Sequence, residues 1–484
     1  MCDTTHGSYN AKIMNKGFFA GKKVLVMGLG RFGGGVDVVK FAFSAGAKVT
    51  VTDLAPIDQL RDSVRQLEEF TQIQYHLGSH EPADFEQADI IVVNPAVDPD
   101  SEFIKLARRH NRLVTSQIGI FAQMCPAVII GITGANGKST TTSLTTHLLR
   151  AGLGQKGLRY KKVWLSGNIG NEPLLTTIEQ ISPDDLVVLE LSSFQIEQLA
   201  QIPKMPLVAL LTNLTPNHLD RYGTFDDYCA AKENIFKFQK PAGGRLPVSI
   251  FNAEDKIAAE WFEKYSADRK RVCIKFSADQ INQEIRAAFP LPGRANLSNL
   301  AAAAAIAGYF GIEDKRIKRH LPDFKALPHR LELVAEINGV RWYNDSKATT
   351  PDSTIVALEA FDNPEIIIAG GYDKHIPFNQ LGEKIAERAK AAILIGQTAE
   401  RIAEAIAAYP GHRTRIEIVD SLAKAVDLAG QLALSGDVVL LSPACASYDM
   451  FDNFQQRGQL FSSLVREVSY RNMPTKEPKG SRKT

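Results

Sequence analysis

The sequence predicts an α/β protein of three domains, and three glycine-marked segments carry this prediction. Residues 22–53 are predicted to form a strand, a glycine-rich turn, a helix and a second strand, which is one βαβ unit. Residues 127–150 repeat the order of strand, glycine-rich turn and helix. Residues 331–441 open with the hairpin signal Asn338-Gly339 and continue as alternating strands and helices. A chain of 484 residues is also too long for one hydrophobic core.

The first domain, residues 1–117, is predicted to be Rossmann-like. Its predicted elements are the strand 24–27, the helix 36–45 and the strands 48–52, 90–93 and 114–116. Gly-Leu-Gly-Arg-Phe-Gly (28–33) fits the GxGxxG fingerprint, and Asp53 follows about 20 residues later. Backbone amides at a helix N-terminus can hold the diphosphate of any nucleotide. The fingerprint alone favours a dinucleotide-binding oxidoreductase, so the class of nucleotide stays open at this point.

The second domain, residues 118–326, is predicted to be a central P-loop ATPase-like domain. Its loop Gly131–Thr140 contains Gly-Lys-Ser-Thr, follows the apolar strand 127–130 and precedes the helix 141–150. The N–H groups of such a loop converge on phosphate, Lys138 adds a positive charge and the Ser139 hydroxyl can reach Mg²⁺. Ile132 stands where the strict pattern has glycine, so an ordinary strand-to-helix turn is the alternative.

Further elements of the second domain follow the phosphate loop. The predicted strands are 164–170, which leads into a loop, 186–191 and 208–213. Glu190 lies near the end of a buried strand, where ligands bind in open α/β sheets. A helix that carries Lys232 comes next, and the alanine-rich stretch 296–308 is predicted to be a core helix.

The third domain, residues 327–484, is predicted to be a C-terminal Rossmann-like domain. Asn338-Gly339 joins the strands 331–337 and 340–343 in a hairpin. The further predicted strands are 366–369, 391–395 and 438–441, and helices separate them.

Composition excludes several classes of function. The net charge of +2 gives no electrostatic case for nucleic acid as the main partner, and the basic residues at 476–483 are expected to be a solvated tail. The five cysteines form no CxxC pair, which argues against a zinc site or a disulfide framework and fits a reducing compartment. No signal peptide and no run of about 18 apolar residues is found. We therefore expect a cytoplasmic protein without a membrane span.

Seven short motifs occur in an order that resembles the Mur ligase family, over about residues 22–468. They are Ala-Asn-Gly-Lys-Ser-Thr (135–140), Gly-Asn-Ile-Gly (167–170), Glu-Leu-Ser-Ser-Phe-Gln (190–195), His-Leu-Asp-Arg-Tyr (218–222), Leu-Pro-His-Arg (327–330), Asn-Asp-Ser-Lys-Ala-Thr (344–349) and Leu-Ser-Pro-Ala-Cys-Ala-Ser (441–447). With Asp449 and Asn453-Phe454, the last motif is similar to the branch of the family that adds D-glutamate.

The resemblance implies an ATP-dependent amide ligase of peptidoglycan precursor synthesis. ATP phosphorylates the carboxylate of UDP-N-acetylmuramoyl-L-alanine, the amine of D-glutamate attacks the acyl phosphate, and phosphate leaves. The implied cofactors are ATP, a pair of Mg²⁺ ions and CO₂ held as a lysine carbamate. The diphosphate loop of the first domain would then hold UDP, not NAD. A monomer is expected.

The resemblance also implies the residues of the site. The catalytic group is Lys138, Glu190, His218 and Lys232, and the metal ligands are Ser139, Glu190, His218 and Lys232. The ATP site is Gly134, Asn136, Gly137, Lys138, Ser139, Thr140, Asn296, Arg330 and Asp345, with His329 near the phosphate. The site for the UDP substrate is Gly28, Gly30, Arg31, Phe32, Gly33, Asp53, Asn168 and His218. The D-glutamate pocket is Lys347, Thr349, Lys374, Ser447 and Phe454.

Lys232 resembles the family's lysine that carries a carbamate. Adding CO₂ to its amine turns a cation, which would repel a metal, into an anion that can bridge Mg²⁺. The alternative is an ordinary lysine on an amphipathic helix.

Three departures from the family pattern concern single contacts. Ala295-Asn296 stands where family members usually carry His-Asn, and the loop 154–163, with four basic residues, is longer than usual. Gln117 stands where an acidic residue is common.

Other functions are alternatives to a ligase that adds D-glutamate. A sibling ligase that adds L-lysine or diaminopimelate carries Asp-Asn-Pro-Arg after the strand that is 366–369 here, whereas Asp362-Asn363-Pro364-Glu365 precedes it and is interpreted as a loop turn. Folylpolyglutamate synthase lacks a GxGxxG domain. An NAD-dependent dehydrogenase has no use for the phosphate loop, and a non-catalytic nucleotide sensor would not need Lys138, Glu190 and His218 together.

Overall fold

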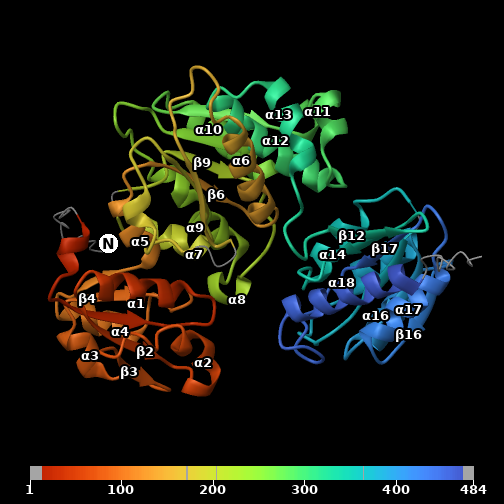
Figure 1. Ribbon diagram of the computed structural model, residues 1–484, viewed down its shortest axis with the longest axis horizontal. Helices are drawn as coiled ribbons and strands as arrows, with labels where there is room; N and C mark the ends of the chain where they lie inside the picture. Colours follow the sequence, from red (N-terminus) through yellow and green to blue (C-terminus); the bar gives the residue numbers. More distant parts are fainter. Residues whose placement is uncertain (1–13, 170–172, 203, 364, 472–484) are drawn as a thin grey trace, which may run out of the picture. The chain divides into compact units, whose positions relative to one another are not determined.

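The computed structural model describes residues 14–169, 173–202, 204–363 and 365–471 (Figure 1). Contacts divide the chain into two compact units, Met1–Ile285 with Ser298–His320, and Arg286–Leu297 with Leu321–Thr484. The first unit contains two parallel sheets and the second unit contains one mixed sheet. The basic tail at 476–483, Gly170 and Pro364 lie outside the described residues.

The first sheet has five parallel strands in the order β3-β2-β1-β4-β5. Its strands are β1 (Lys23–Met27), β2 (Lys48–Asp53), β3 (Gln74–Leu77), β4 (Ile90–Val93) and β5 (Leu113–Thr115). The helices are η1 (Lys16–Phe19), α1 (Gly34–Ser44), α2 (Ile57–Arg65), α3 (Pro82–Gln87) and α4 (Glu102–Arg109). Alternate residues of β1 and β4 enter different apolar clusters, so the sheet is buried on both faces. The strand order reverses between β1 and β4, which is where such sheets bind ligands.

The second sheet has six parallel strands in the order β11-β10-β9-β6-β8-β7. Its strands are β6 (Val128–Thr133), β7 (Val163–Gly167), β8 (Leu186–Glu190), β9 (Val208–Leu211), β10 (Val248–Asn252) and β11 (Val272–Phe276). The helices from α6 to α13 are α6 (Lys138–Ala151), α7 (Ser193–Ala200), α8 (Leu219–Tyr222), α9 (Phe225–Lys237), α10 (Lys256–Ser266), α11 (Gln283–Ala288), α12 (Arg294–Tyr309) and α13 (Asp314–His320). Strand β6 lies inside the sheet, so the loop after it begins at a buried strand end.

Helix α5 (Gln117–Met124) joins the first two sheets. Ser116 caps it by accepting a hydrogen bond from the Gly119 amide. The helix contacts both α1 and α7, and one apolar cluster runs continuously from the first sheet through α5 to the second. The two domains of the first unit therefore share part of their core.

The sheet of the second unit has the order β12-β13-β17-β14-β15-β16. Its strands are β12 (Glu332–Ile337), β13 (Val340–Asn344), β14 (Glu365–Ala369), β15 (Ala389–Leu394), β16 (Arg415–Ile418) and β17 (Val438–Leu441). Its helices are α14 (Pro351–Leu358), α15 (Asn379–Arg388), α16 (Ala399–Ala407), α17 (Leu422–Leu432) and α18 (Phe454–Arg471). Only β12 and β13 pair antiparallel among these strands. Asn338 and Gly339 take φ of 53° and 77°, as a two-residue hairpin turn requires.

The predicted three-domain α/β fold is confirmed, and one sheet falls within each predicted range. The predicted hairpin is confirmed as well. The strands β3, β10, β11 and β16 were not predicted. Glu365, interpreted from sequence as part of a loop turn, is instead the first residue of β14. The exact domain boundaries stay a prediction.

None of the helices in the described part of the chain combines the length and the apolar character needed to cross a bilayer.

Candidate functional site

The phosphate loop between β6 and α6 has a shape that only glycine allows at two positions. Gly134 and Gly137 take φ of 148° and 79°. A side chain at Gly134 would overlap Thr212 Oγ1, and a side chain at Gly137 would overlap Asn299 Oδ1. The Thr212 hydroxyl also donates to the Asn136 carbonyl at 2.7 Å. The loop is therefore fixed by its neighbours before α6 begins.

Lys138 starts α6 and folds back over this loop. Its Nζ donates to the carbonyls of Gly134 at 3.0 Å and Ala135 at 2.7 Å. Ser139 and Thr140 are buried in the first turn, where the backbone amides and the helix dipole favour an anion. An ammonium and a helix N-terminus thus converge on one place, which suits the outer phosphates of a nucleotide.

Sequence analysis missed two residues of this loop's support, Thr212 and Asn299. Asn299 accepts a hydrogen bond from Thr141 Oγ1 at 3.1 Å and lies against Gly137. The available signal was that Asn296 and Asn299 are three residues apart in an otherwise alanine-rich helix. Residues at that spacing lie near the same face of a helix. Thr212 follows β9 directly and gave no comparable signal.

Glu190 fits the role of a metal ligand. It ends β8 beside Ile132 of β6 and its side chain is buried. Its Oε2 has no hydrogen-bond partner among the described residues. A buried carboxylate oxygen without a partner is unfavourable, and a hard cation such as Mg²⁺ would satisfy it. Ser139, at the start of α6, carries a hydroxyl oxygen, and oxygen is the ligand type that Mg²⁺ prefers.

Lys232 lies on α9 with only 2% of its surface exposed. Its Nζ donates to Thr133 Oγ1 at 3.2 Å, at the end of β6. Burial first, and then the charge of Lys138, lower the pKa of Lys232 well below its usual value, while Cys229 and Glu190 oppose this shift. The fold therefore favours the neutral amine at this position.

His218 occupies the N-terminal cap of α8 in a left-handed backbone conformation, with φ of 54°. Its ring centroid lies 5.0 Å from Phe194 and 6.3 Å from Tyr228. Partial burial and the charge of Lys232 lower the pKa of His218, and Asp220 opposes this shift. A neutral imidazole is the form that can ligate a metal.

The diphosphate loop of the first sheet precedes α1 at the point where the strand order reverses. Gly28, Gly30 and Gly33 all take positive φ, and Gly33 is the N-terminal cap of α1. Asp53 accepts hydrogen bonds from the amides of Gly30 at 3.1 Å and Ala55 at 2.9 Å, so it shapes this loop.

The two side chains in the middle of the diphosphate loop face outward. Arg31 Nη2 donates to Gln59 Oε1 at 2.6 Å, and Phe32 is 83% exposed. An apolar ring that is so exposed next to a helix N-terminus is available to contact a ligand.

Asp37 of α1 ties the diphosphate loop to the second domain, and sequence analysis missed it. Its carboxylate accepts from the amides of Leu174 at 3.1 Å, Leu175 at 2.8 Å and Thr176 at 3.0 Å, and from Thr176 Oγ1 at 2.8 Å. A fifth hydrogen bond comes from Gln117 Nε2 at 2.7 Å. Gln117 can donate here, whereas an ionised acidic side chain at this position could not.

Asn168, predicted to contact the UDP substrate, directly follows β7. Its amide donates to the Glu190 carbonyl at 3.0 Å, so its backbone lies beside the candidate metal ligand. A side chain at the preceding Gly167 would overlap that same backbone, which explains why glycine stands there.

In the second unit, the predicted nucleotide residues Arg330 and Asp345 lie within electrostatic reach of each other. This buried carboxylate accepts from Leu331 N at 3.2 Å and Ser442 Oγ at 2.9 Å. Burial raises the pKa of Asp345 to about 7, although these hydrogen bonds and the charge of Arg330 oppose the shift. Asn296 donates to the Pro292 carbonyl at 2.8 Å, at the start of α12.

The predicted D-glutamate residues lie on segments that meet at the carboxyl edge of the sheet in the second unit. Lys347 Nζ lies 5.3 Å from the ring centroid of Phe454, and Thr349 follows in the same loop. Ser447 is buried. Tyr372 N donates to Ala446 O at 2.9 Å, which places the segment leading to the exposed Lys374 beside Ser447.

Arg457 of α18 supports this group, and its role was not predicted. Its side chain is almost fully buried and donates to Ser346 Oγ at 3.0 Å, Ser346 O at 2.8 Å and Cys445 O at 3.1 Å. It thereby joins the loop that carries Lys347 to the loop that carries Ser447. Burial lowers the pKa of Arg457 to about 10, a value that still leaves it charged at neutral pH.

Three family models match the chain. The Mur ligase MurD-like N-terminal domain matches residues 22–116, the Mur ligase middle domain residues 132–307, and the Mur ligase glutamate ligase domain residues 329–445. Two UDP-N-acetylmuramoylalanine–D-glutamate ligases are close in sequence. The Roseiflexus enzyme is 38% identical and the Geotalea uraniireducens enzyme 39% identical, each over 92% of this chain and 98% of its own.

Solved structures show the same fold. The UDP-N-acetylmuramate-alanine ligase of Thermotoga maritima has a TM-score of 0.56 and 18% identity, over 92% of this chain and 100% of that one. MurF from Acinetobacter baumannii also has a TM-score of 0.56, with 16% identity over 92% of this chain and 91% of that one. At such low identity these two likenesses describe architecture alone.

Proposed function

The chain belongs to the Mur ligase family, and from this premise we propose that it joins D-glutamate to UDP-N-acetylmuramoyl-L-alanine. The reaction consumes ATP, forms an amide and belongs to peptidoglycan precursor synthesis, and hence to cell-wall biogenesis, cell shape and cell division. Full-length relatives that carry this activity in their names support the choice of acceptor.

The structural observation that carries the proposal is the group at the phosphate loop. Lys138 covers the loop, Glu190 presents a buried oxygen without a hydrogen bond among the described residues, and the buried Lys232 lies within electrostatic reach of both. Cation, metal ligand and anion-binding helix terminus are the parts that transfer of a phosphoryl group to a carboxylate requires.

The chemistry follows from the poor reactivity of a carboxylate toward an amine. A carboxylate oxygen of UDP-N-acetylmuramoyl-L-alanine attacks the γ-phosphorus of ATP, ADP leaves and an acyl phosphate forms. The neutral amine of D-glutamate then attacks the acyl carbon, inorganic phosphate departs with the bonding electrons, and the amine loses a proton. Lys138 offsets the negative charge of the phosphates and of the attacking carboxylate.

Mg²⁺ would be held by Ser139, Glu190, His218 and Lys232 as its carbamate, and when bound it supplies positive charge against the phosphates. The low pKa of Lys232 supports the carbamate, because the neutral amine is the form that reacts with CO₂. Ser139, Glu190, His218 and a carbamate on Lys232 would together supply the ligands for the pair of Mg²⁺ ions that we propose.

The remaining residues bind and orient the substrates. Gly28, Gly30, Gly33 and the start of α1 hold the UDP diphosphate, with Arg31, Phe32, Asp53 and Asn168 completing this site. Asn296, Arg330 and Asp345 contact ATP. Lys347, Thr349, Lys374 and Ser447 bind the two carboxylates of D-glutamate, and Phe454 excludes water from it.

ATP and UDP-sugar precursors are cytoplasmic metabolites, so we place the reaction in the cytoplasm. One chain carries candidate residues for all three substrates, so the proposal requires no second copy. Sedimentation at micromolar concentration reports whether the protein is a monomer.

The test is phosphate release with substrates omitted in turn. Release is expected only when UDP-N-acetylmuramoyl-L-alanine, ATP, Mg²⁺ and D-glutamate are all present. Release that requires no UDP substrate would contradict the proposal. A sibling activity would accept L-lysine or diaminopimelate instead, and an NAD-dependent dehydrogenase would reduce NAD without releasing phosphate.

A further inference from the structure

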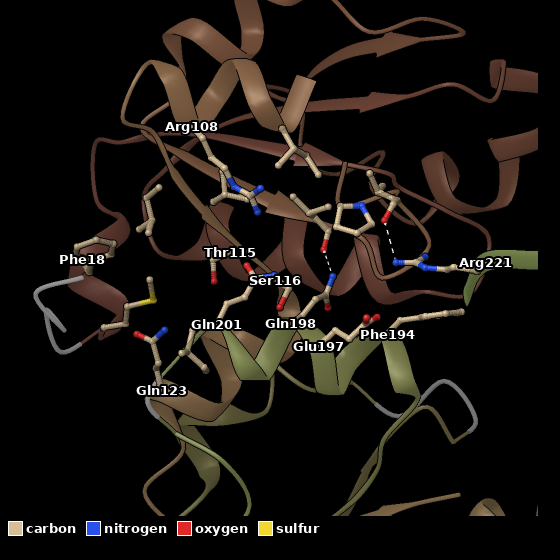
Figure 2. A pocket seen from close by; sticks show the side chains of 18 residues that line it. Phe18, Arg108, Thr115, Ser116, Gln123, Phe194, Glu197, Gln198, Gln201 and Arg221 are labelled. Carbon is tan, nitrogen blue, oxygen red and sulfur yellow. Dashed lines mark hydrogen bonds between the residues drawn. The ribbon is translucent and has the colours of Figure 1, made fainter. Parts of the chain in front are cut away.

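Arg221 joins the helix that follows His218 to the first domain. It lies on α8, three residues after His218, and its guanidinium reaches the loop at residues 94–99 that follows β4. Nη1 donates to Pro95 O at 3.1 Å. Nη2 donates to Val97 O at 3.4 Å (Figure 2). This pair of hydrogen bonds spans two domains of one compact unit.

The loop that Arg221 contacts rests on the diphosphate loop. Asn94 Nδ2 donates to Gly28 O at 3.3 Å. A side chain at Gly28 would lie 2.8 Å from Asn94 Cβ, so the two backbones approach closely. A shift of the loop at 94–99 would therefore be transmitted to the residues proposed to hold the UDP diphosphate.

At its other end Arg221 fixes the backbone of His218. The amides of Arg221 and Tyr222 both donate to His218 O, at 3.1 Å and 3.0 Å. The guanidinium carbon of Arg221 lies 4.1 Å from the ring centroid of Phe194, and this ring also contacts His218. A non-glycine residue in a left-handed conformation persists only where its surroundings hold it, and Arg221 is part of those surroundings.

Hydrogen bonds, not packed side chains, span much of the space between the loop and α7. A cavity of about 340 Å³ lies there, and Figure 2 shows its lining. Val97 and Pro99 border it from the loop, and Gln198 and Ile202 from the second domain. Besides Arg221, Gln198 Nε2 crosses this space to Val93 O at 3.4 Å. Side chains at this cavity therefore do not fill the space that the Arg221 guanidinium bridges.

We infer that Arg221 is a positioning residue that couples the site for the UDP substrate to the His218 side of the nucleotide site. This inference rests on the proposed function, which gives His218 its role. Binding of the UDP substrate fixes the loop at 94–99, and Arg221 transmits that constraint to the backbone of His218. Because coupling is reciprocal, Mg²⁺ and a nucleotide bound at the phosphate loop change the affinity for the UDP substrate by the same factor by which the UDP substrate changes theirs.

The experiment is calorimetry of UDP-N-acetylmuramoyl-L-alanine binding with and without Mg²⁺ and a non-hydrolysable ATP analogue. In the wild-type chain the affinity is expected to differ by about 5-fold or more between the two conditions, the usual lower range for coupled sites. In R221Q this factor falls toward 1. R221K, which keeps a cation but loses the two-pronged geometry, gives an intermediate factor.

Arg316 offers a matched control. It also bridges two backbone carbonyls, those of Ala151 at 2.6 Å and Leu153 at 3.2 Å, but on α13. R316Q is expected to keep the wild-type factor while losing a similar amount of stability.

An unchanged factor in R221Q, or no coupling in the wild-type chain, would overturn the inference. The inference would also be overturned if R221Q and R316Q both changed only the unfolding midpoint and left the affinity factor for the UDP substrate unchanged. The calorimetry uses no acceptor amino acid. Failure of D-glutamate to support turnover would therefore count against the proposed function, and the binding result could still be interpreted.

Discussion

At the scale of single residues, the fold changes the chemical character of Lys232. An exposed lysine is a cation at neutral pH, whereas burial and Lys138 hold the pKa of this one well below its usual value. The neutral amine can add CO₂, and the resulting carbamate can face Mg²⁺ without repulsion. Under the proposed function, the burial that is unfavourable for a charged lysine would favour the carbamate.

Replacing Lys232 tests this role. Lys232→Ala is expected to lower the rate of phosphate release by about 100-fold or more, because the proposed carbamate anion is lost. Short carboxylic acids such as acetate should restore part of the rate by supplying an anion at the same place. Lys237→Ala, at an exposed position of the same helix, is expected to have no effect. Full activity of Lys232→Ala would end the carbamate hypothesis.

Glu365 is a second buried ionisable residue, and its effect is on stability. Both of its side-chain oxygens lack a hydrogen bond among the described residues, and Arg388 Nε lies 4.0 Å away. Burial raises the pKa of Glu365 to about 9, and Arg388 only partly opposes this. The folded state therefore favours the protonated acid. Its contribution to stability is complete at low pH and is lost as the pH rises through the raised pKa.

The prediction concerns Glu365→Gln, which resembles the protonated acid. Between pH 5.5 and pH 8.5 the wild-type free energy of opening at β14 should fall by up to ~4 kcal/mol more than that of the variant, from 1.36 kcal/mol per pH unit. Amide hydrogen exchange in the full chain, corrected for its intrinsic pH dependence, measures this difference. Parallel pH profiles for the two proteins would show that Glu365 is ionised in the fold.

At the scale of elements, the phosphate loop depends on glycines for two separate reasons. Gly137 takes φ of 79° and also lies against Asn299. Gly154 takes a similar φ of 78°, but among the described residues no heavy atom lies within 4 Å of the place that a Cβ would occupy. Because Gly154 follows the C-terminal end of α6, it offers a control for left-handed strain outside the phosphate loop.

Gly137→Ala is expected to weaken ATP binding by about 10-fold or more, because left-handed strain of about 1–2 kcal/mol would be imposed within the loop proposed to hold the phosphates. The overlap with Asn299 adds to that loss by displacing the loop. Gly154→Ala carries the strain without the overlap and is expected to leave ATP affinity unchanged. Equilibrium binding of a nucleotide analogue provides the measurement, and equal ATP affinities for both variants would refute the argument.

At the scale of the whole molecule, Asp37 is a principal polar link between the first and second domains. Asp37→Ala removes the acceptor of five hydrogen bonds and leaves buried amides unpaired, at a cost of about 3 kcal/mol or more. We expect faster hydrogen exchange at residues 174–176 and weaker binding of the UDP substrate.

Asp185→Ala is the control for Asp37→Ala. Asp185 accepts from Ser182 N at 3.0 Å and Trp164 Nε1 at 2.9 Å, both within the second domain. This variant should lose stability without a change in affinity for the UDP substrate. If Asp37→Ala behaves in the same way, the link has no role in assembling the substrate site.

Local signals made most of the fold predictable from sequence. Glycine-rich turns, the Asn338-Gly339 hairpin and apolar strands each depend on a few neighbouring residues. Three of the four missed strands, β3, β11 and β16, are partly exposed edge strands, whose apolar pattern is weak. The fourth, β10, is a short buried strand, and periodicity alone does not identify such a strand. The missed site residues Asp37, Thr212, Asn299 and Arg457 act through contacts between segments far apart in the sequence, which no local pattern reports.

A competition between acceptor amino acids tests the proposed function most sharply. The purified chain is given UDP-N-acetylmuramoyl-L-alanine, ATP and Mg²⁺ with an equimolar mixture of D-glutamate, L-glutamate, L-lysine and diaminopimelate, and the products are identified by mass and chirality. We expect one amide product, that of D-glutamate, with one phosphate released per amide. A lysine or diaminopimelate product without a D-glutamate product would contradict it.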